Sequence, residues 1–452
     1  MTYSDDIKKL LEITDPNITF IEGCLDQDAI TLNGVLYQTV SATLSYDPVA
    51  CPCCHQKNIN NSILKHGFKQ VKVKYACSLA CPKLILLKKQ RFICKACKKT
   101  FMAQTNLVEP NCQISNLQKQ LVKEQLRLVQ SASLIAKNTY VSISTVVRVL
   151  DSLEKQMKPQ TNTLPTTLSF DELRTTKSCK AEMSFIYANA STHQVLDLLD
   201  SRQQADIKKH FFRFPLDARR QVEWITMDMN LPFISMIKTL FPCAKIVIDR
   251  FHIIQLLNRA LNNLRIQVMN QYKKKPSKCD YNKLKKLWKL LLKNREDLDF
   301  ENYQTHRLFD GLVTEKMMVE YLLSLDIGLR NAYEKINDFK YAIMTHDVEL
   351  FHYELQEIKK YSYRQVIRTA FNTITRYQEY ITNALTVTLS NGHLEATNNI
   401  IKTIKRTGHG YTNFRRLRLR ARYILLSKNC TNQDYRPLYF SQEKESKTEK
   451  TA

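Results

Sequence analysis

Four cysteines near the N-terminus form two closely spaced pairs. Cys51 and Cys54 have the C-x2-C spacing, and Cys94 and Cys97 repeat it after 39 intervening residues. Each pair can place two thiolates on one tight turn, and two such turns complete a tetrahedral Zn²⁺ site with no open position for chemistry. We therefore expect a structural Zn²⁺, with ordinary buried thiols as the alternative. Other potential ligands nearby leave the choice of ligand set open: Cys53, His55, Cys77 and Cys81.

The cysteines are expected to be thiols rather than disulfides. Their number, 13, is odd, and the N-terminal sequence MTYSDDIKKLLEI begins with acids and lacks the apolar core of a secretory signal. Disulfide frameworks belong to secreted proteins, so paired spacings in this chain indicate metal ligands. No apolar run reaches the ~18 residues that a membrane span needs. We expect an intracellular protein without a membrane partner.

Three aspartates follow apolar, strand-like runs in a region where strands and helices alternate. They are Asp171 in TLSFDEL, Asp228 in EWITMDMN and Asp249 in AKIVIDRFH. One such acid often marks only the point where a strand meets solvent, but three suggest a cluster at one end of a sheet. Crowded carboxylates repel and raise one another's pKa. Mg²⁺ removes this repulsion, since it favours a few carboxylates together with phosphate oxygens.

A fourth acid, Glu395, precedes a long basic stretch in SNGHLEATNNIIKTIKRTGHGY. On a helix, Asn398, Asn399, Lys402 and Arg406 would share its face, at i+3, i+4, i+7 and i+11. The order of a carboxylate, two amides and then cations fits a metal ligand followed by groups that hold a phosphodiester. The alternative is a solvated helix with one stray acid. A neighbouring apolar stripe would pack this helix on the sheet: Leu394, Ile401 and Ile404.

The charge balance indicates a polyanionic partner. The formal net charge is +25 and the pI about 9.5, which favours nucleic acid over a solvated basic surface. An anionic membrane is less expected, because the basic run FRRLRLRARYILL lies deep in the chain. The cations expected to bind DNA phosphates, besides those already named, are Lys405, Arg415, Arg416 and Arg418.

The segment SASLIAKNTYVSISTVVRVLDSLEKQ predicts two short helices joined by a turn. Ser142 is a plausible N-cap for the second helix, which carries apolar residues at helical spacing. This pattern fits a helix-turn-helix, whose second helix enters a major groove and would bring Ser144 and Arg148 to DNA. An ordinary helix pair is the alternative. The apolar positions are Val146, Val147 and Leu150.

At 452 residues and 52.9 kDa, the chain is long enough for several cores. We expect a multidomain α/β protein. The predicted parts are an N-terminal α+β segment at 1–48, a zinc-ribbon-like module at 49–108, a helix-turn-helix domain at 113–160, the first part of a catalytic core at 165–252, a helical insertion at 253–386, a catalytic helix with the basic C-terminal part of the core at 387–430, and a tail at 431–452.

Nearly the whole chain resembles transposases of the ISL3 insertion-sequence family. The matching blocks are CPCC…CKAC, SFDEL, TMDM, FPCAKIVIDRFHIIQLLNRALN, LSNGHLEATNNIIKTIKR and GYTNFRRLRLR. The resemblance implies a DDE catalytic domain with an RNase H-like fold, in which Asp171, Asp228 and Glu395 hold two Mg²⁺ or Mn²⁺ ions. Asp249 also occupies a family motif position, as a supporting partner or as an alternative to Asp228. The sequence departs from the family pattern at Phe170 and Ala396, where tryptophan and glycine are common.

The resemblance also implies a function. A nucleoid-associated bacterial transposase would bind the terminal inverted repeats of an insertion sequence through the zinc module and the helix-turn-helix. It would then cleave the transposon end with water and join the 3′-hydroxyl to target DNA by two-metal phosphoryl transfer. Pairing two ends implies a homodimer in the active complex. The alternatives are a non-catalytic DNA-binding regulator or domesticated transposase, and a metal-dependent nuclease that cuts without joining.

Overall fold

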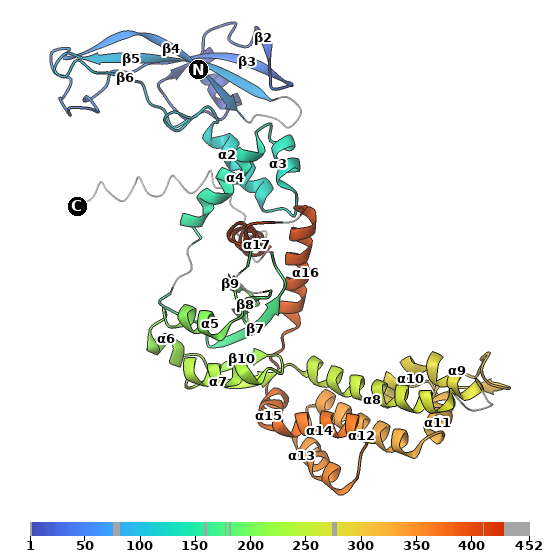
Figure 1. Cartoon of the computed structure of the whole chain (residues 1–452). Helices are drawn as coiled ribbons and strands as arrows, with labels where there is room; N and C mark the ends of the chain where they lie inside the picture. The colour runs from blue at the N-terminus through green and yellow to red at the C-terminus, as the bar shows by residue number, and fades with distance from the viewer. Residues whose placement is uncertain are drawn as a thin grey trace. The chain divides into compact units, whose positions relative to one another are not determined.

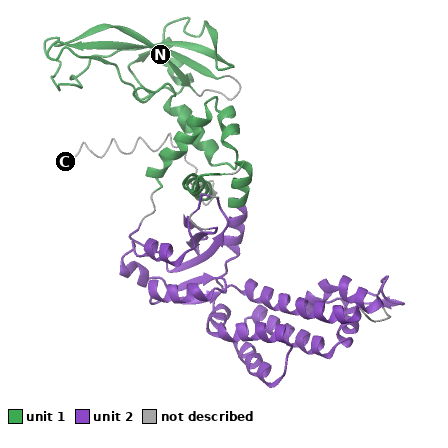
Figure 2. Ribbon diagram, in the orientation of Figure 1, with its two compact units in different colours: residues 1–158, 401–452 green, residues 159–400 purple. Residues whose placement is uncertain are grey.

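The computed structural model describes residues 2–75, 82–157, 161–176, 178–179, 182–273, 278–409 and 411–428. The chain forms two compact units (Figure 2). One comprises Met1–Lys158 and Ile401–Ala452, and the other Pro159–Ile400. The division falls inside a single helix, α16 (Gly392–Thr407). Two of the open zinc ligands, Cys77 and Cys81, and the predicted tail lie outside the described residues.

The N-terminal sheet belongs to the first unit and holds six strands in the order β1-β3-β5-β4, with β2 on β3 and β6 on β5. β3 pairs with β5 in parallel, so the predicted segments 1–48 and 49–108 share one sheet and one core. The two strands expected between the cysteine pairs are present as β4 and β5. The elements are α1 (Tyr3–Leu10), β1 (Ile18–Thr19), β2 (Gln27–Leu32), β3 (Val35–Leu44), β4 (Ile63–Tyr75), β5 (Lys83–Cys94) and β6 (Thr100–Met102).

Three helices follow, α2 (Asn116–Leu126), α3 (Ala132–Asn138) and α4 (Ile143–Ser152). The Ser142 side chain accepts a hydrogen bond from the Thr145 N–H and caps α4, as predicted. The C-terminal helix α17 (Phe414–Lys428) packs on this bundle. The shared core buries Val122, Leu126, Ile135, Val146 and Leu150 together with Leu419 of α17.

The second unit contains a five-stranded sheet in the order β11-β10-β7-β8-β9. β7, β8 and β9 form an antiparallel meander, whereas β10 runs parallel to β7 and β11 parallel to β10. The carboxyl ends of β7, β10 and β11 therefore meet at one edge of the sheet. All five strands were predicted: β7 (Thr167–Leu173), β8 (Ser184–Asn189), β9 (Val195–Leu199), β10 (Trp224–Met227) and β11 (Lys245–Ile248).

An aromatic cluster joins this sheet to the helices beside it, α5 (Gln204–Phe211), α6 (Leu216–Arg220) and α7 (Leu231–Leu240). The ring centroid of Phe170 lies 5.0 Å from that of Phe185 and 5.6 Å from that of Phe211. Phe170 is 1% exposed, so the residue next to Asp171 is fixed by packing, which limits how far this carboxylate can move.

The insertion between β11 and α16 is almost entirely helical, as expected (Figure 1). The long helix α8 packs against α12 and α14, and α15 packs on β11. Its helices are α8 (Arg250–Tyr272), α9 (Lys278–Lys286), α10 (Trp288–Leu292), α11 (Glu315–Ser324), α12 (Ile327–Thr345), α13 (Val348–Glu357), α14 (Gln365–Arg376) and α15 (Gln378–Thr386), with a two-stranded hairpin of β12 (Gln304–Thr305) and β13 (Leu312–Val313). None of the helices in the described ranges is long and apolar enough to cross a membrane.

Candidate active site and zinc site

The four cysteines of the two C-x2-C pairs converge, with all four sulfur atoms within 4.8 Å of one another. Cys51 Sγ lies 3.7 Å from Cys97 Sγ, and Cys54 Sγ lies 3.8 Å from Cys94 Sγ. Four sulfur atoms placed ~2.3 Å from a central Zn²⁺ form a tetrahedron with edges of about 3.8 Å. The cluster is therefore compatible with a zinc module. Cys53 is exposed and not part of this group.

The two cysteine turns have matching backbone geometry. The His55 N–H donates to the Cys51 carbonyl (2.9 Å), and the Lys98 N–H donates to the Cys94 carbonyl (2.8 Å). Both donors have left-handed backbones, with φ of 60° at His55 and 56° at Lys98. This conformation is uncommon outside glycine, and here it turns the chain back directly after each pair. His55 thus shapes the turn.

The pKa values of two thiols of this cluster are shifted in opposite directions. Burial opposes ionisation of the Cys51 thiol, but the backbone N–H groups of Cys54 and Cys53 outweigh it and lower its pKa to about 6. The Gln56 N–H favours a Cys54 thiolate, yet burial and the neighbouring thiols raise the Cys54 pKa to about 12. The Cys54 thiol thus retains a proton that a coordinated divalent cation would displace.

The three aspartates predicted at strand ends gather at one edge of the second unit's sheet. Asp171 lies in β7, Asp228 follows β10, and Asp249 follows β11 and caps α8, accepting a hydrogen bond from the Phe251 N–H (3.2 Å). We call Asp171, Asp228, Asp249 and the adjacent His252 the acidic edge. His252 Nε2 lies 2.8 Å from Asp228 Oδ1.

Burial and mutual repulsion shape the electrostatics of the acidic edge. Burial and the negative charge of Asp228 raise the pKa of Asp171 to about 6, against hydrogen bonds from the Glu172 N–H and the Asn398 side chain. Burial likewise raises the pKa of Asp249, which is 7% exposed. The contact with Asp228 raises the pKa of His252. Bringing these acids together is unfavourable without added positive charge.

Helix α16 meets the acidic edge through Asn398. Its Nδ2 donates to Asp171 Oδ2 (2.6 Å), and the residue is 7% exposed. Glu395, one turn earlier, has an exposed side chain. In the described part of the chain, no three acids approach within 4.8 Å of one another as the cysteines do. The structure thus brings the three aspartates together and places Glu395 on the helix that contacts them.

Asn391, which sequence reasoning missed, connects the elements of this site. Its side chain accepts from Thr226 Oγ1 (2.5 Å) and donates to the Phe170 carbonyl (3.0 Å), and its backbone N–H stabilises the Asp249 carboxylate. It therefore joins β7, β10 and the start of α8 to α16. Its one sequence signal is its place immediately before the helix that carries Glu395.

His252 was also missed, although its position offered a signal. It follows Asp249 by three residues, so on the first turn of α8 the two side chains lie on the same side of the helix. The contact with Asp228 then connects the ends of β10 and β11.

The residues predicted to bind DNA differ in their surroundings. Ser144 and Arg148 are exposed on α4, and Asn399, Lys402 and Arg406 are exposed on α16. The Arg148 guanidinium also donates to Thr145 Oγ1 (3.1 Å). Lys405 is half-buried. Asn398 is buried, and its amide donates to Asp171.

Two arginines of α17 form ion pairs within the first unit. Arg415 pairs with Glu154, with a 2.8 Å contact from its Nε, and Arg416 Nη2 lies 3.0 Å from Asp151 Oδ2. Arg418 is half-buried. Part of the basic run therefore docks α17 on α4, and its charge is less available to DNA than the sequence suggested.

A sheet edge lined by buried and half-buried carboxylates, beside a helix with a further acid and several cations, is typical of metal-dependent enzymes acting on phosphate esters. Residues 168–421, more than half of the 452, match the family model of the ISL3 DDE transposases, described as "Transposase". The chain belongs to this family of transposases.

The chain is also similar to a protein of Lactococcus lactis subsp. lactis described as an "ATP-dependent protease". The two are 30% identical over 139 residues, which cover 27% of this chain and 44% of that protein. The chain thus spans less than half the length of this curated relative.

Proposed function

We propose that this transposase cleaves the ends of its insertion sequence and joins them to target DNA by metal-dependent phosphoryl transfer. The observation that carries the proposal is the acidic edge, where Asp171, Asp228 and Asp249 meet and Asn398 of α16 contacts Asp171. A purely structural sheet edge gains nothing from close carboxylates, two of which, Asp171 and Asp249, have pKa values raised by burial and by the charge of Asp228.

The catalytic core is proposed to be RNase H-like. The strand order supports this, since a three-stranded antiparallel meander is extended by two parallel strands on the side of its first strand. In this arrangement the first acid lies on β7 and the second directly after β10, at one edge.

Asp171, Asp228 and Glu395 are proposed to hold two Mg²⁺ or Mn²⁺ ions, which when bound activate the attacking oxygen and stabilise the leaving oxygen. The donors fit, because all are carboxylates, the oxygen ligands that Mg²⁺ prefers. Asn398 fixes one oxygen of Asp171. Glu395 is the exposed member, so it can approach the others when α16 adjusts around substrate.

Asp249 is proposed as a positioning residue rather than a ligand. Its carboxylate caps α8 and accepts from the N–H groups of Phe251 and Asn391. These bonds fix the first turn of α8 and so hold His252 against Asp228. Substitution of Asp249 should therefore weaken activity without abolishing it.

The terminal inverted repeats are proposed to be recognised by the first unit. α4, with exposed Ser144 and Arg148, would enter a major groove as the second helix of a helix-turn-helix. The sheet would add backbone contacts, since β4 exposes Lys65, Lys69 and Lys72. Structural Zn²⁺ would hold the base of that strand. A homodimer would pair the two ends.

One assay distinguishes the possible functions. A labelled transposon-end duplex is incubated with the protein and a supercoiled target in Mg²⁺ or Mn²⁺, and nicked and joined products are separated. We expect both nicked and joined products. Binding without cleavage would favour a regulator or domesticated transposase, and cleavage without joining a nuclease.

A further inference from the structure

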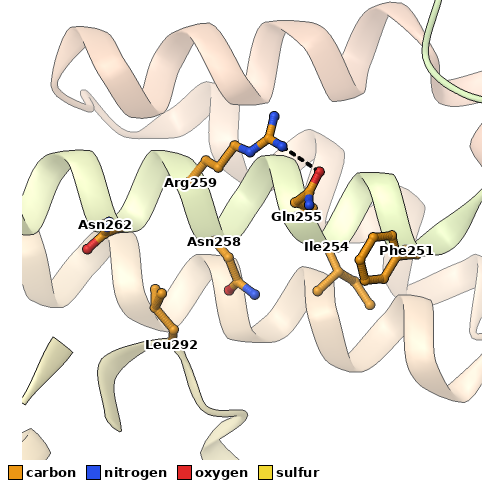
Figure 3. Close-up of a pocket in the computed structure, with 7 residues that line it drawn as sticks. All are labelled: Phe251, Ile254, Gln255, Asn258, Arg259, Asn262 and Leu292. Atoms are coloured by element: carbon orange, nitrogen blue, oxygen red, sulfur yellow. Dashed lines mark hydrogen bonds between the residues drawn. The ribbon is translucent and has the colours of Figure 1, made fainter. Parts of the chain in front are cut away.

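A groove of about 320 Å³ runs along one side of α8 within the second unit (Figure 3). It begins two residues after Asp249, at Phe251, and continues through Gln255, Asn258 and Asn262, with Leu292 of α10 on the opposite side. These α8 residues recur at helical spacing and form one face. The groove therefore begins on the first turn of α8, the helix that Asp249 caps.

The polar residues that line the groove are three amides and one cation, with no acid, and the rest of the lining is apolar: Phe251, Ile254 and Leu292. Gln255 Oε1 accepts from Arg259 Nη2 (2.7 Å), which leaves the Gln255 amide N–H groups able to donate. Asn258 Oδ1 is sealed from solvent and has no hydrogen-bond partner among the described residues. A buried acceptor without a donor is unfavourable.

Phe251 places an aromatic ring at the end of the groove nearest the acids. Its side chain is 52% exposed, and its ring centroid lies 5.6 Å from that of His252, which in turn lies against Asp228. An exposed phenyl ring gains little from water, but it can stack on a nucleobase.

We propose that the α8 groove binds an unpaired stretch of the DNA strand that flanks the cleaved phosphate, with Phe251 stacked on a base. The inference rests on the proposed function. Amides hydrogen-bond base edges and Arg259 suits a phosphate. A concave protein groove can accept a single base that has left the duplex. Duplex DNA is instead contacted by a protruding protein helix or strand that enters the DNA groove. From Phe251 to Asn262, α8 rises about 16 Å, room for up to about five stacked nucleotides at ~3.4 Å each.

The test combines a protein variant with a DNA lesion. Abasic sites are placed one at a time at five positions on each side of the cleaved phosphate, and cleavage by the full-length protein is compared with that by Phe251→Ala. With intact DNA, Phe251→Ala should lower the cleavage rate about 5- to 100-fold, the range for loss of one stacked base. At one position, the abasic site should lower the wild-type rate similarly, and the two changes together should be no worse than either alone.

Two independent changes probe the rest of the groove. Arg259→Ala and Asn258→Leu should weaken binding of a DNA end carrying unpaired flanking nucleotides more than binding of a fully paired end. Matched controls on the same helix are Asn263→Ala and Gln267→Ala, exposed residues outside the groove, which should retain wild-type rates and binding.

The outcomes separate this inference from the proposed function. If the wild-type protein cleaves while the groove variants behave like their controls, the α8 groove does not hold DNA. Multiplicative effects of Phe251→Ala and every abasic site would refute stacking. Equal losses on paired and unpaired ends would assign the groove to duplex contact and overturn the single-strand proposal. Failure of the wild-type protein to cleave any end would instead refute the proposed function.

Discussion

At the residue scale, Asn391 is the side chain on which the geometry of the acidic edge depends most. Replacing it with alanine removes the donor to the Phe170 carbonyl and the acceptor of the Thr226 hydroxyl, which keeps only its contact with Ser169 Oγ (2.7 Å), in a buried site. We expect Asn391→Ala to lower stability by roughly 2 kcal/mol or more and to reduce cleavage at least tenfold. Thermal melting and the end-cleavage assay measure the two effects.

Its control is Asn263→Ala, which removes an exposed amide elsewhere in the unit and should leave both quantities unchanged. If Asn391→Ala melts and cleaves as the wild-type protein does, α16 is held at the acidic edge by other contacts and the importance given to Asn391 is wrong.

Lys340 makes the folding stability of the helical insertion depend on pH. The residue is 1% exposed, its Nζ donates to the Leu292 carbonyl (3.1 Å), and burial lowers its pKa from 10.5 to about 8. Between pH 8 and 10.5 the unfolded chain holds a proton on Lys340 that the folded chain has lost. Stability from this group therefore rises with pH across that window, by on the order of 1–3 kcal/mol.

The check is the difference in melting temperature between the wild-type protein and Lys340→Met, measured from neutral pH to above pH 10. The wild-type protein should gain stability relative to the variant as the pH rises. The control is Lys285→Met at an exposed lysine, whose difference in melting temperature from the wild-type protein should not depend on pH. If the difference for Lys340→Met is also independent of pH, Lys340 titrates normally.

Sequence reasoning recovered some site residues and not others for physical reasons. Asp171, Asp228 and Asp249 could be predicted because each follows a short apolar run, a local signal. Asn391 could not, because its partners lie 165 and 221 residues away. The buried contact of Asn398 with Asp171 could not be predicted for the same reason. The sequence predicted the helical face that carries Asn398, but not the residue that this face contacts.

At the element scale, the two cysteine turns should behave as one zinc module. We expect about one Zn²⁺ per chain, and loss of that Zn²⁺ in Cys54→Ser, because removing one thiolate opens the tetrahedron. The chelated or mutated protein should melt at a lower temperature. Metal analysis and thermal melting provide the measurements.

Cys53→Ser is the matched control, since Cys53 lies between the ligands but outside the cluster. It should keep Zn²⁺ and its stability. If Cys53→Ser loses Zn²⁺ while Cys54→Ser keeps it, the predicted ligand set is wrong.

Element types were largely predictable, but the partners of the elements were not. The five strands of the second sheet and the two between the cysteine pairs follow from apolar patterning. Segments 1–48 and 49–108 share one sheet because β3 pairs with β5. Pairing between strands distant in sequence produces no local sequence pattern from which it could be predicted. The docking of α17 on α4 likewise depends on ion pairs such as Arg416 with Asp151.

At the scale of the whole molecule, the net charge of +25 should make DNA binding strongly dependent on salt. Each phosphate contact contributes about 0.9 to the log–log slope. We expect Lys402→Ala with Arg406→Ala to reduce the slope by about 2, because both side chains are exposed. Arg415→Ala should change it less, since this arginine already pairs with Glu154.

Anisotropy of a labelled end duplex, titrated between about 50 and about 200 mM KCl, provides the slopes. A larger change for Arg415→Ala than for the double variant would mean that α17 faces DNA and that its ion pairs open on binding.

Asp171, Asp228 and Glu395 are proposed to form one metal-dependent catalytic site, and end cleavage by matched variants in Mn²⁺ is the decisive measurement. Each of the variants Asp171→Asn, Asp228→Asn and Glu395→Gln should bind the transposon end with wild-type affinity. Each should lower the cleavage rate by three or more orders of magnitude, because loss of one metal ligand removes roughly several kcal/mol of transition-state stabilisation. Asp249→Asn should retain measurable cleavage, and exposed Asp217→Asn should cleave normally. Cleavage that persists in Glu395→Gln, or that proceeds equally in the presence of a chelator, would contradict the account.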